Sequence, residues 1–166
     1  MDTFYILPFF GQIDTANLTD YYLTECEYNG TMLRLDLNFE HLNVSIDRLD
    51  VVKKLLDNIP MIDAKNKYYI AEDFNSVVCG EVREYINHHM DELNPEDLQQ
   101  LVSYENQSLS AEEQLLKRFE LVRIGFYPQD EHFMILDYSI GTDFTQYLLA
   151  MYNDENADII QINWES

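Results

Sequence analysis

Apolar and polar side chains alternate in two runs, residues 21–28 and 31–39, that meet at Asn29-Gly30. Asn-Gly between two such runs predicts a β-hairpin with a type I′ turn, because that turn needs positive φ at both central residues. A two-residue loop fixes the register as Tyr28–Thr31, Cys26–Leu33, Thr24–Leu35 and Tyr22–Leu37. The other face pairs Glu25 with Arg34 and Leu23 with Asp36, so it is expected to be wetter.

The middle of the chain follows a helical period. Apolar residues recur at i, i+3, i+7 and i+10 at Leu49, Val52, Leu56 and Ile59, which predicts one buried stripe. The expected helices span residues 45–59, 61–74, 77–93, 95–103 and 110–117. Asn43 or Ser45 would cap the first helix and Pro60 would end it. Asn94-Pro95 is a start signal for the fourth helix, and Ser110 with Glu113 has capping-box spacing.

The third helix is expected to bury Val78, Val82, Ile86 and Leu93 on one face. The strand period returns afterwards, with predicted strands at residues 119–126, 132–140, 147–152 and 158–164. Short turns between close strands predict an antiparallel meander. Residues 3–13 read as an extended segment or a short edge strand, because Pro8 cannot donate to a ladder.

This order of elements predicts an α+β fold and a single domain over residues 1–166. We expect the N-terminal hairpin and the C-terminal meander to form a sheet, with the central helical segment packed on one face.

Charge adds a prediction about partners. The chain has 31 acidic and 10 basic residues, a formal net charge of −21. This field repels nucleic acid and anionic membranes and favours a basic protein. Residues 1–33 and 124–166 contain five and eight acidic residues and no basic one. If both ends join one sheet, that sheet and its turns are expected to form a negative surface uninterrupted by Lys or Arg.

The predicted partner-binding residues are the carboxylates of the turns: Asp130, Glu131, Asp143, Asp154, Glu155 and Asp158. The alternative is that these carboxylates only maintain solubility and prevent sheet edges from aggregating.

A metal site is the second chemical candidate. Glu81, Glu84, His88 and Asp91 lie on one face at helical spacing and could bind a divalent metal or share a proton. A solvated acidic face explains the same pattern, since H-E-x-x-H is absent. The turn at Asp154 also lacks the glycine and spacing of a calcium loop. With no nucleophile elbow or phosphate loop, we predict no catalytic residue and no cofactor.

The two cysteines point to a compartment. Cys26 falls in a predicted strand and Cys79 in a predicted helix as a small core residue, and they form no C-x-x-C motif. Free thiols fit a reducing environment. Asp2 stands where a secretory signal would carry Lys or Arg, and no segment is long and apolar enough to span a bilayer. We therefore expect a cytoplasmic protein.

Both ends of the chain contain recognisable motifs. They are Phe9-Phe10-Gly11-Gln12-Ile13-Asp14 with Leu35-Asp36-Leu37-Asn38-Phe39, and Asp137-Tyr138-Ser139-Ile140, Tyr147-Leu148-Leu149, Asp154-Glu155-Asn156 and Trp164-Glu165-Ser166. These motifs resemble a family of uncharacterised bacterial proteins, a domain of unknown function. Ala157 departs from that pattern, which has Gly after Asp154-Glu155-Asn156. The resemblance implies a small cytosolic bacterial α+β protein and supplies no catalytic residues.

The sequence leaves several functions open. Proteins of this general appearance occur among immunity proteins of bacterial toxin systems, so one hypothesis is a non-enzymatic protein that blocks a basic toxin. A DNA-mimic antagonist of a DNA-binding protein is a variant of it. The alternatives are a metal-dependent enzyme that uses Glu81, Glu84, His88 and Asp91, or an accessory domain.

Overall fold

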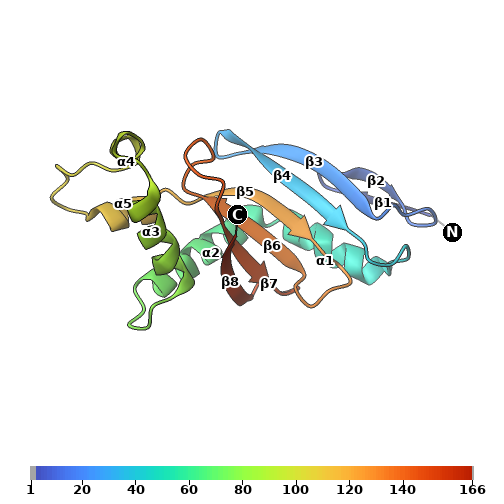
Figure 1. Cartoon of the computed structure of the whole chain (residues 1–166). Coiled ribbons are helices and arrows are strands. Elements are labelled where there is room, and N and C mark those ends of the chain that lie inside the picture. The colour runs from blue at the N-terminus through green and yellow to red at the C-terminus, as the bar shows by residue number, and fades with distance from the viewer. Residues whose placement is uncertain (1–2, 166) are drawn as a thin grey trace.

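A six-stranded sheet in the order β3-β4-β5-β6-β7-β8 organises the chain (Figure 1). The computed structural model describes residues 3–165, so Ser166 of the closing motif lies outside the described residues. The strands of this sheet are β3 (Tyr21–Tyr28), β4 (Thr31–Asn38), β5 (Glu120–Phe126), β6 (Met134–Ser139), β7 (Leu148–Asn153) and β8 (Ile159–Glu165). A separate hairpin is formed by β1 (Phe4–Leu7) and β2 (Gly11–Asp14).

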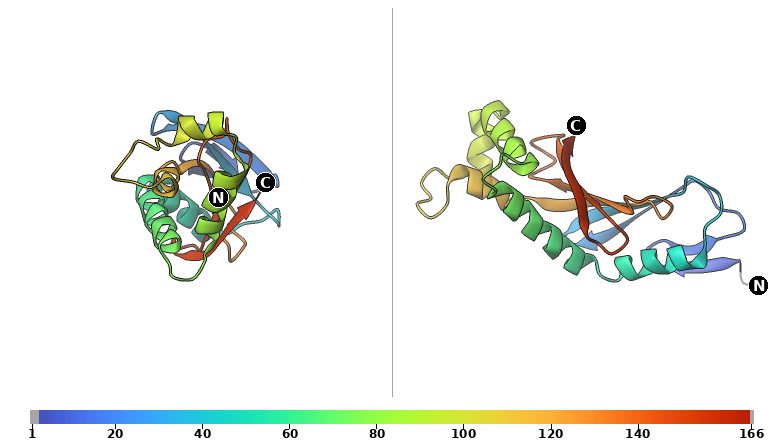
Figure 2. Two further views of the ribbon diagram at one scale, coloured as in Figure 1. Left: turned by 60° about the vertical axis from the view of Figure 1, so that its left-hand side comes forward. Right: turned by 90° about the horizontal axis from the view of Figure 1, so that it is seen from below.

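The helices lie on one face and at one end of the sheet. They are α1 (Ile46–Leu56), α2 (Ile59–Phe74), α3 (Glu81–Glu92), α4 (Pro95–Leu101) and α5 (Ala111–Leu116). α1 and α2 follow one another along one face, whereas α3, α4 and α5 gather at one end of an elongated molecule (Figure 2). The opposite face of the sheet, here called the outer face, carries no helix (Figure 1).

The β3–β4 hairpin has the predicted register along its whole length, from Tyr28 opposite Thr31 to Tyr22 opposite Leu37. Asn29 and Gly30 both have positive φ, 50° and 81°. These angles fit the type I′ turn, whose twist matches that of the flanking strands. The sequence prediction for this hairpin is confirmed.

The hairpin and the meander join through β4 and β5, which pair in parallel with Leu35 opposite Ile124. All other neighbours in the sheet are antiparallel. A parallel pair needs a long crossover connection, and the five helices supply it. The predicted α+β architecture, with one sheet and helices packed on one face, is confirmed.

The core fills the space between the sheet and the helices. Alternate residues of β4 (Leu33, Leu35 and Leu37) are fully buried, because successive side chains of a strand point to opposite faces. The predicted helical stripe meets them, and all four of its members are buried: Leu49, Val52, Leu56 and Ile59.

Three expected boundaries are wrong. Residues 3–13 contain two strands, because Phe9 and Gly11 take positive φ and turn the chain back. Pro60 lies in the first turn of α2 and does not end α1 there, because a proline needs no amide partner in that position. The third helix starts at Glu81, so Val78, predicted to be buried, is 72% exposed. Cys79, predicted as a core residue on a helix, is exposed in the preceding loop.

The predicted helix starts at Asn94 and Ser110 are confirmed. The Asn94 side chain accepts a hydrogen bond from the Asp97 N–H at 2.8 Å. Ser110 and Glu113 form the reciprocal capping box. At Ala157, where the family pattern has Gly, φ is +62°, so the alanine occupies the left-handed conformation that glycine favours.

Buried polar pairs attach α2 to the sheet. The Asp63 carboxylate is 3% exposed and accepts hydrogen bonds from the hydroxyls of Tyr28 (2.7 Å) and Tyr138 (3.0 Å). Asn66 and Asn153 exchange amide hydrogen bonds one turn further along the helix. Buried polar groups need such partners, so these pairs fix how α2 lies on β3, β6 and β7.

Substitution of Asp63 tests this attachment of α2. Asp63→Ala leaves the buried Tyr138 hydroxyl and the Tyr28 hydroxyl without their acceptor. The free energy of unfolding should therefore fall by about 2–4 kcal/mol in urea denaturation. Glu72→Ala on the exposed side of α2 is the control and should change it by less than about 0.5 kcal/mol. Equal effects of the two substitutions would contradict this account of Asp63.

Candidate functional site

The turns that follow β5 and β7 lie at the same end of the sheet, since β5 and β7 run in the same direction. Asp130 and Glu131 belong to the first turn, and Asp154, Glu155 and Asp158 to the second. Arg48 of α1 links the two turns: its Nε donates to the Pro128 carbonyl at 2.7 Å, and its Nη1 binds Glu155. We call this region the acidic end.

Five of the six predicted partner-binding residues thus come together, and Asp143 does not. Asp143 lies in the loop between β6 and β7, at the opposite end of the sheet. It lines a separate depression of about 430 Å³ with Met32 and Glu120.

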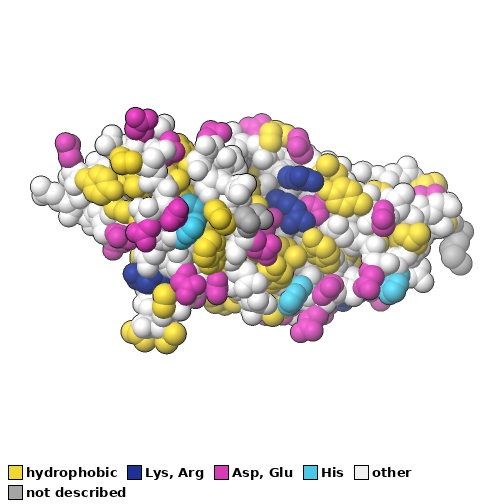
Figure 3. Space-filling model, in the orientation of Figure 1, with side chains coloured by type: hydrophobic (Ala, Val, Ile, Leu, Met, Phe, Trp, Pro, Cys, Tyr) yellow, Lys and Arg dark blue, Asp and Glu magenta, His cyan; other side chains and the backbone are white. Residues whose placement is uncertain are grey.

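Lys and Arg side chains interrupt the acidic surface, which corrects the expectation of an uninterrupted one. Arg48 pairs with Glu155, and Lys65 of α2 pairs with Asp158. Asp154 accepts the backbone N–H groups of Asn156 and Asp158, so it holds its own turn. Arg34 and Arg123 are register partners on β4 and β5, and Figure 3 shows Lys or Arg side chains among the acidic ones on the outer face. The prediction of an uninterrupted negative surface is wrong because these cations belong to helices, or to strand positions outside residues 1–33 and 124–166.

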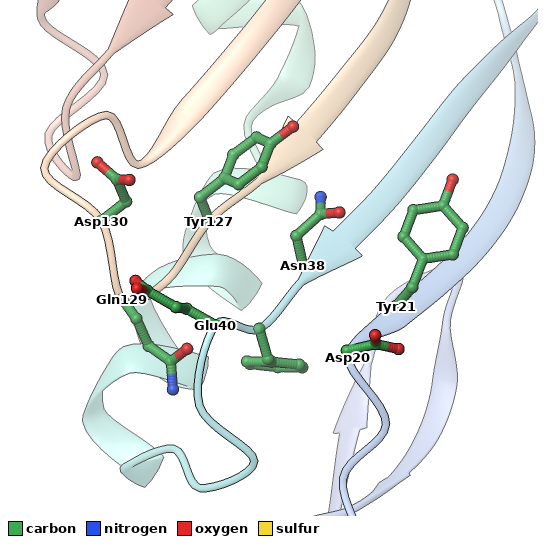
Figure 4. A pocket seen from close by; sticks show the side chains of 8 residues that line it. Asp20, Tyr21, Asn38, Glu40, Tyr127, Gln129 and Asp130 are labelled. Carbon is green, nitrogen blue, oxygen red and sulfur yellow. The ribbon is translucent and has the colours of Figure 1, made fainter.

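A cavity of about 390 Å³ opens at the acidic end, between the turn after β5 and the start of β3 (Figure 4). Its lining consists of three carboxylates, three aromatic rings and two amides: Asp20, Glu40, Asp130, Tyr21, Phe39, Tyr127, Asn38 and Gln129. In residues 3–165, no Lys, Arg or His side chain forms a salt bridge with Asp20, Glu40 or Asp130. These carboxylates therefore line the cavity without a salt bridge to a cation of the described residues.

Two arginines of the sheet position the tyrosines of this cavity. Arg123 Nη2 donates to the Tyr127 hydroxyl at 2.9 Å, and Arg34 Nη2 donates to the Tyr21 hydroxyl at 3.0 Å. Both hydroxyls thus point along the outer face, and the two rings flank the opening (Figure 4). Gln129 fixes the rim by amide hydrogen bonds to the backbone of His41 and Asn43.

Arg123 belongs to a charged network on the outer face. Its Nε and Nη2 bind both oxygens of Asp36 at 2.7 and 2.9 Å, and its Nη1 binds Asp137 at 3.0 Å. Burial by itself would lower the pKa of Arg123, but its hydrogen bonds with Asp36 and Tyr127 raise it above the ordinary value. Burial raises the pKa of Asp137, and Arg123 opposes that rise.

Gly125 makes room for this network. A Cβ at Gly125 would lie 2.5 Å from Arg123 Nη2 and 3.0 Å from the Tyr127 ring. Asp36 is only 1% exposed, although the hairpin register predicts that it lies on the more solvated face. No local sequence pattern indicates this network, because Asp36 and Arg123 are 87 residues apart and meet through the β4–β5 pairing.

The metal candidates on α3 have other neighbours. The centroid of the His88 ring lies 5.1 Å from those of both Trp164 and Tyr147, and the Glu84 carboxylate accepts a hydrogen bond from the Cys79 thiol at 3.9 Å. Glu81 is half-buried and Asp91 exposed. In the described part of the chain, no group of three His, Cys, Asp or Glu side chains is placed to hold a metal ion.

The neighbouring His89 is the buried imidazole of α3. Its Nδ1 donates to the Tyr85 carbonyl at 2.7 Å, so in the neutral ring Nε2 accepts from the Thr145 hydroxyl at 2.8 Å. Burial lowers the pKa of His89, and nearby His88 lowers it further, while the hydrogen bond to Tyr85 opposes both effects. We assign His89 a structural part in joining α3 to the β6–β7 loop.

No known protein family, characterised protein or solved structure shows significant similarity to this chain. The resemblance of its terminal motifs to a bacterial family therefore stays a prediction.

That geometry suits a cation. Carboxylates beside aromatic faces attract guanidinium and ammonium groups both by charge and through the negative face of each ring. The cavity is large enough for the end of a long side chain, and it opens to solvent at the acidic end.

Replacement of Arg123 tests the network that supports the cavity. Arg123→Met leaves Asp36 and Asp137 without their cation and should lower the free energy of unfolding at pH 7 by about 3 kcal/mol. Loss of the cation also raises the pKa of Asp137 further, so the native variant binds a proton that its unfolded chain binds only at lower pH. The deficit relative to wild type should therefore shrink as pH falls from 7 towards 4.

Urea denaturation at several pH values measures this deficit. Arg34→Met is the matched control, because it removes only the hydrogen bond to the Tyr21 hydroxyl, and should cost less than about 1.5 kcal/mol. A deficit for Arg123→Met that stayed constant with pH would contradict the proposed coupling.

Acid should also weaken the protein through His89. With its pKa lowered in the folded state, the unfolded chain takes up a proton first, at about pH 6.5, so stability falls as pH decreases from 7.5 to 5.5. The contribution of one such group has a slope of at most about 1.4 kcal/mol per pH unit. His89→Gln should flatten the dependence measured by urea denaturation, whereas His41→Gln, at an exposed site, should leave it unchanged.

Proposed function

We propose that this chain is a non-enzymatic binding module for a basic protein, which it recognises at the acidic end of its sheet. The cavity carries the proposal, because Asp20, Glu40 and Asp130 line it together with three aromatic residues and form no salt bridge within residues 3–165. Exposed Glu131 and half-buried Asp154 extend the same surface.

Charge supports a protein partner in particular. A chain with a formal net charge of −21 attracts basic proteins over distance and accelerates their association at low salt. Nucleic acids and anionic membranes carry charge of the same sign. No helix in residues 3–165 has the length and apolarity to cross a membrane.

A basic toxin is one partner of this class, and the chain would then act as its immunity protein by covering a cationic cleft. A cytoplasmic location belongs to this proposal as well, supported by the two free thiols of Cys26 and Cys79. The fold offers the acidic end as a rigid recognition surface in such a complex, because Arg48, Gln129 and Arg123 hold its turns in place.

The decisive experiment compares two variants of equal charge. Asp20→Asn/Glu40→Gln/Asp130→Asn removes the cavity carboxylates, whereas Glu72→Gln/Glu92→Gln/Glu105→Gln removes three exposed carboxylates elsewhere. Each variant neutralises three side chains, so the formal net charge becomes −21 + 3 = −18 in both. A difference in binding then reports position and not total charge.

The proteins serve as bait in lysate of the source cell at low and high salt, and captured proteins are identified by mass spectrometry. A basic protein should bind wild type and the Glu72 control variant and weaken as salt rises. The cavity variant should bind the purified partner about tenfold or more weakly. Equal binding by both variants would remove the acidic end as the recognition surface.

A further inference from the structure

The outer edge of β3 is open. β3 pairs only with β4, and β8 forms the opposite edge of the sheet. Around the two-residue turn, Tyr28 and Thr31 form the first hydrogen-bonded pair, so in an antiparallel ladder Cys26, Thr24 and Tyr22 also bond to β4. The backbone groups of Leu23, Glu25 and Glu27 consequently point away from the sheet.

These outward groups have no partner in the described part of the chain. No hydrogen bond from another segment reaches the backbone of Leu23, Glu25 or Glu27, whereas the Tyr21 carbonyl accepts one from the Thr19 hydroxyl. The turn before β2 approaches β3 through the Thr24 side chain, which donates to the Phe9 carbonyl at 3.1 Å.

Apart from the charges of Glu25 and Glu27, β3 lacks the features that usually protect an edge strand. It is eight residues long, pairs with β4 without a register shift, and contains no Pro or Lys. Bulges, Pro and Lys commonly prevent pairing with another chain. The β8 edge is different, because its register shifts at Tyr152/Asn153 and α3 packs on it with His88 against Trp164.

The side chains along this edge indicate which kind of strand could pair with it. Glu25 and Glu27 are exposed on the outer face, and neither carboxylate forms a salt bridge within residues 3–165. A second copy of β3 would place like charges side by side, which is unfavourable. A strand with Lys or Arg at alternate positions would instead pair with both carboxylates, and its intervening residues would meet half-buried Cys26 and Tyr28.

We propose that the β3 edge binds an extended segment of a basic partner as a seventh strand, with basic and apolar side chains in alternation. This inference rests on the proposed function for the nature of the partner. It adds the mode of recognition: backbone hydrogen bonds to Leu23, Glu25 and Glu27 supply affinity, and alternate side chains supply specificity. Tyr21, which begins β3, also lines the cavity, so the edge leads directly to the acidic end.

The probe is an acetylated and amidated (Lys-Val)4 peptide, labelled for fluorescence anisotropy. Its control is the same peptide with a backbone N-methyl group on every residue, which retains the charge but has no backbone N–H left to donate at either edge. We expect binding of the first peptide and at least tenfold weaker binding of the second. Equal affinities, or no binding of either peptide at low salt, would overturn the proposal.

Two substitutions at one position separate backbone from charge. The Glu25 N–H points outward, so Glu25→Pro removes a donor from the open edge and none from the β3–β4 ladder. Glu25→Pro should lower the affinity for the peptide at least tenfold, whereas Glu25→Gln should lower it only a few-fold. The amide signals of Cys26 and Leu33 report whether the hairpin remains formed, and the N-methylated peptide provides the same test without any substitution.

Amide hydrogen exchange of wild type gives a direct readout. The amides of Leu23, Glu25 and Glu27 should exchange rapidly in the free protein and become protected when the peptide binds. Binding without protection of these three amides would overturn the seventh strand while leaving the acidic end intact. Self-association that Glu25→Pro abolishes would show a second copy as the occupant, and would equally overturn the proposal.

Discussion

The parallel pairing of β4 with β5 is the contact on which the rest of this structure depends. It joins a local hairpin to a distant meander and so creates one sheet with one core. The same pairing places Asp36 and Arg123 on neighbouring strands, where the guanidinium binds both oxygens of the carboxylate. Closing the long loop that contains the five helices costs conformational entropy. Burial of the apolar side chains of β4 against β5 and α1 offsets that cost.

The sheet uses its two faces differently. On the helix side, apolar side chains dominate, and a few buried polar pairs, such as Asp63 with Tyr138, select one position for α2. The outer face has no covering helix and carries the charged network of Arg123 instead. Gly125 leaves space there for the Arg123 guanidinium. Because Arg123 also holds the Tyr127 hydroxyl, the network that stabilises the sheet shapes the cavity at its end.

Acidic residues have more than one part in this protein. Glu155 and Asp158 bind cations of the helices, Asp154 holds its turn, and Asp36 is buried beside Arg123. The cavity carboxylates, by contrast, form no salt bridge within residues 3–165, although Asp130 also accepts the backbone N–H of His132 at 2.9 Å. Total charge explains attraction over distance, but the few unpaired carboxylates determine where a cation can bind.

The sequence alone determined the elements whose signals are local. Asn29-Gly30 set the hairpin register, Asn94 and Ser110 marked two helix starts, and alternation with short turns gave the meander. The meander order also places the turns after β5 and β7 at one end of the sheet, since antiparallel strands alternate in direction. Only the tertiary structure decided which carboxylates are paired, that Asp36 is buried, and that Asp20, Glu40 and Asp130 share a cavity. These features depend on contacts between residues far apart in the chain, and periodicity carries no information about such contacts.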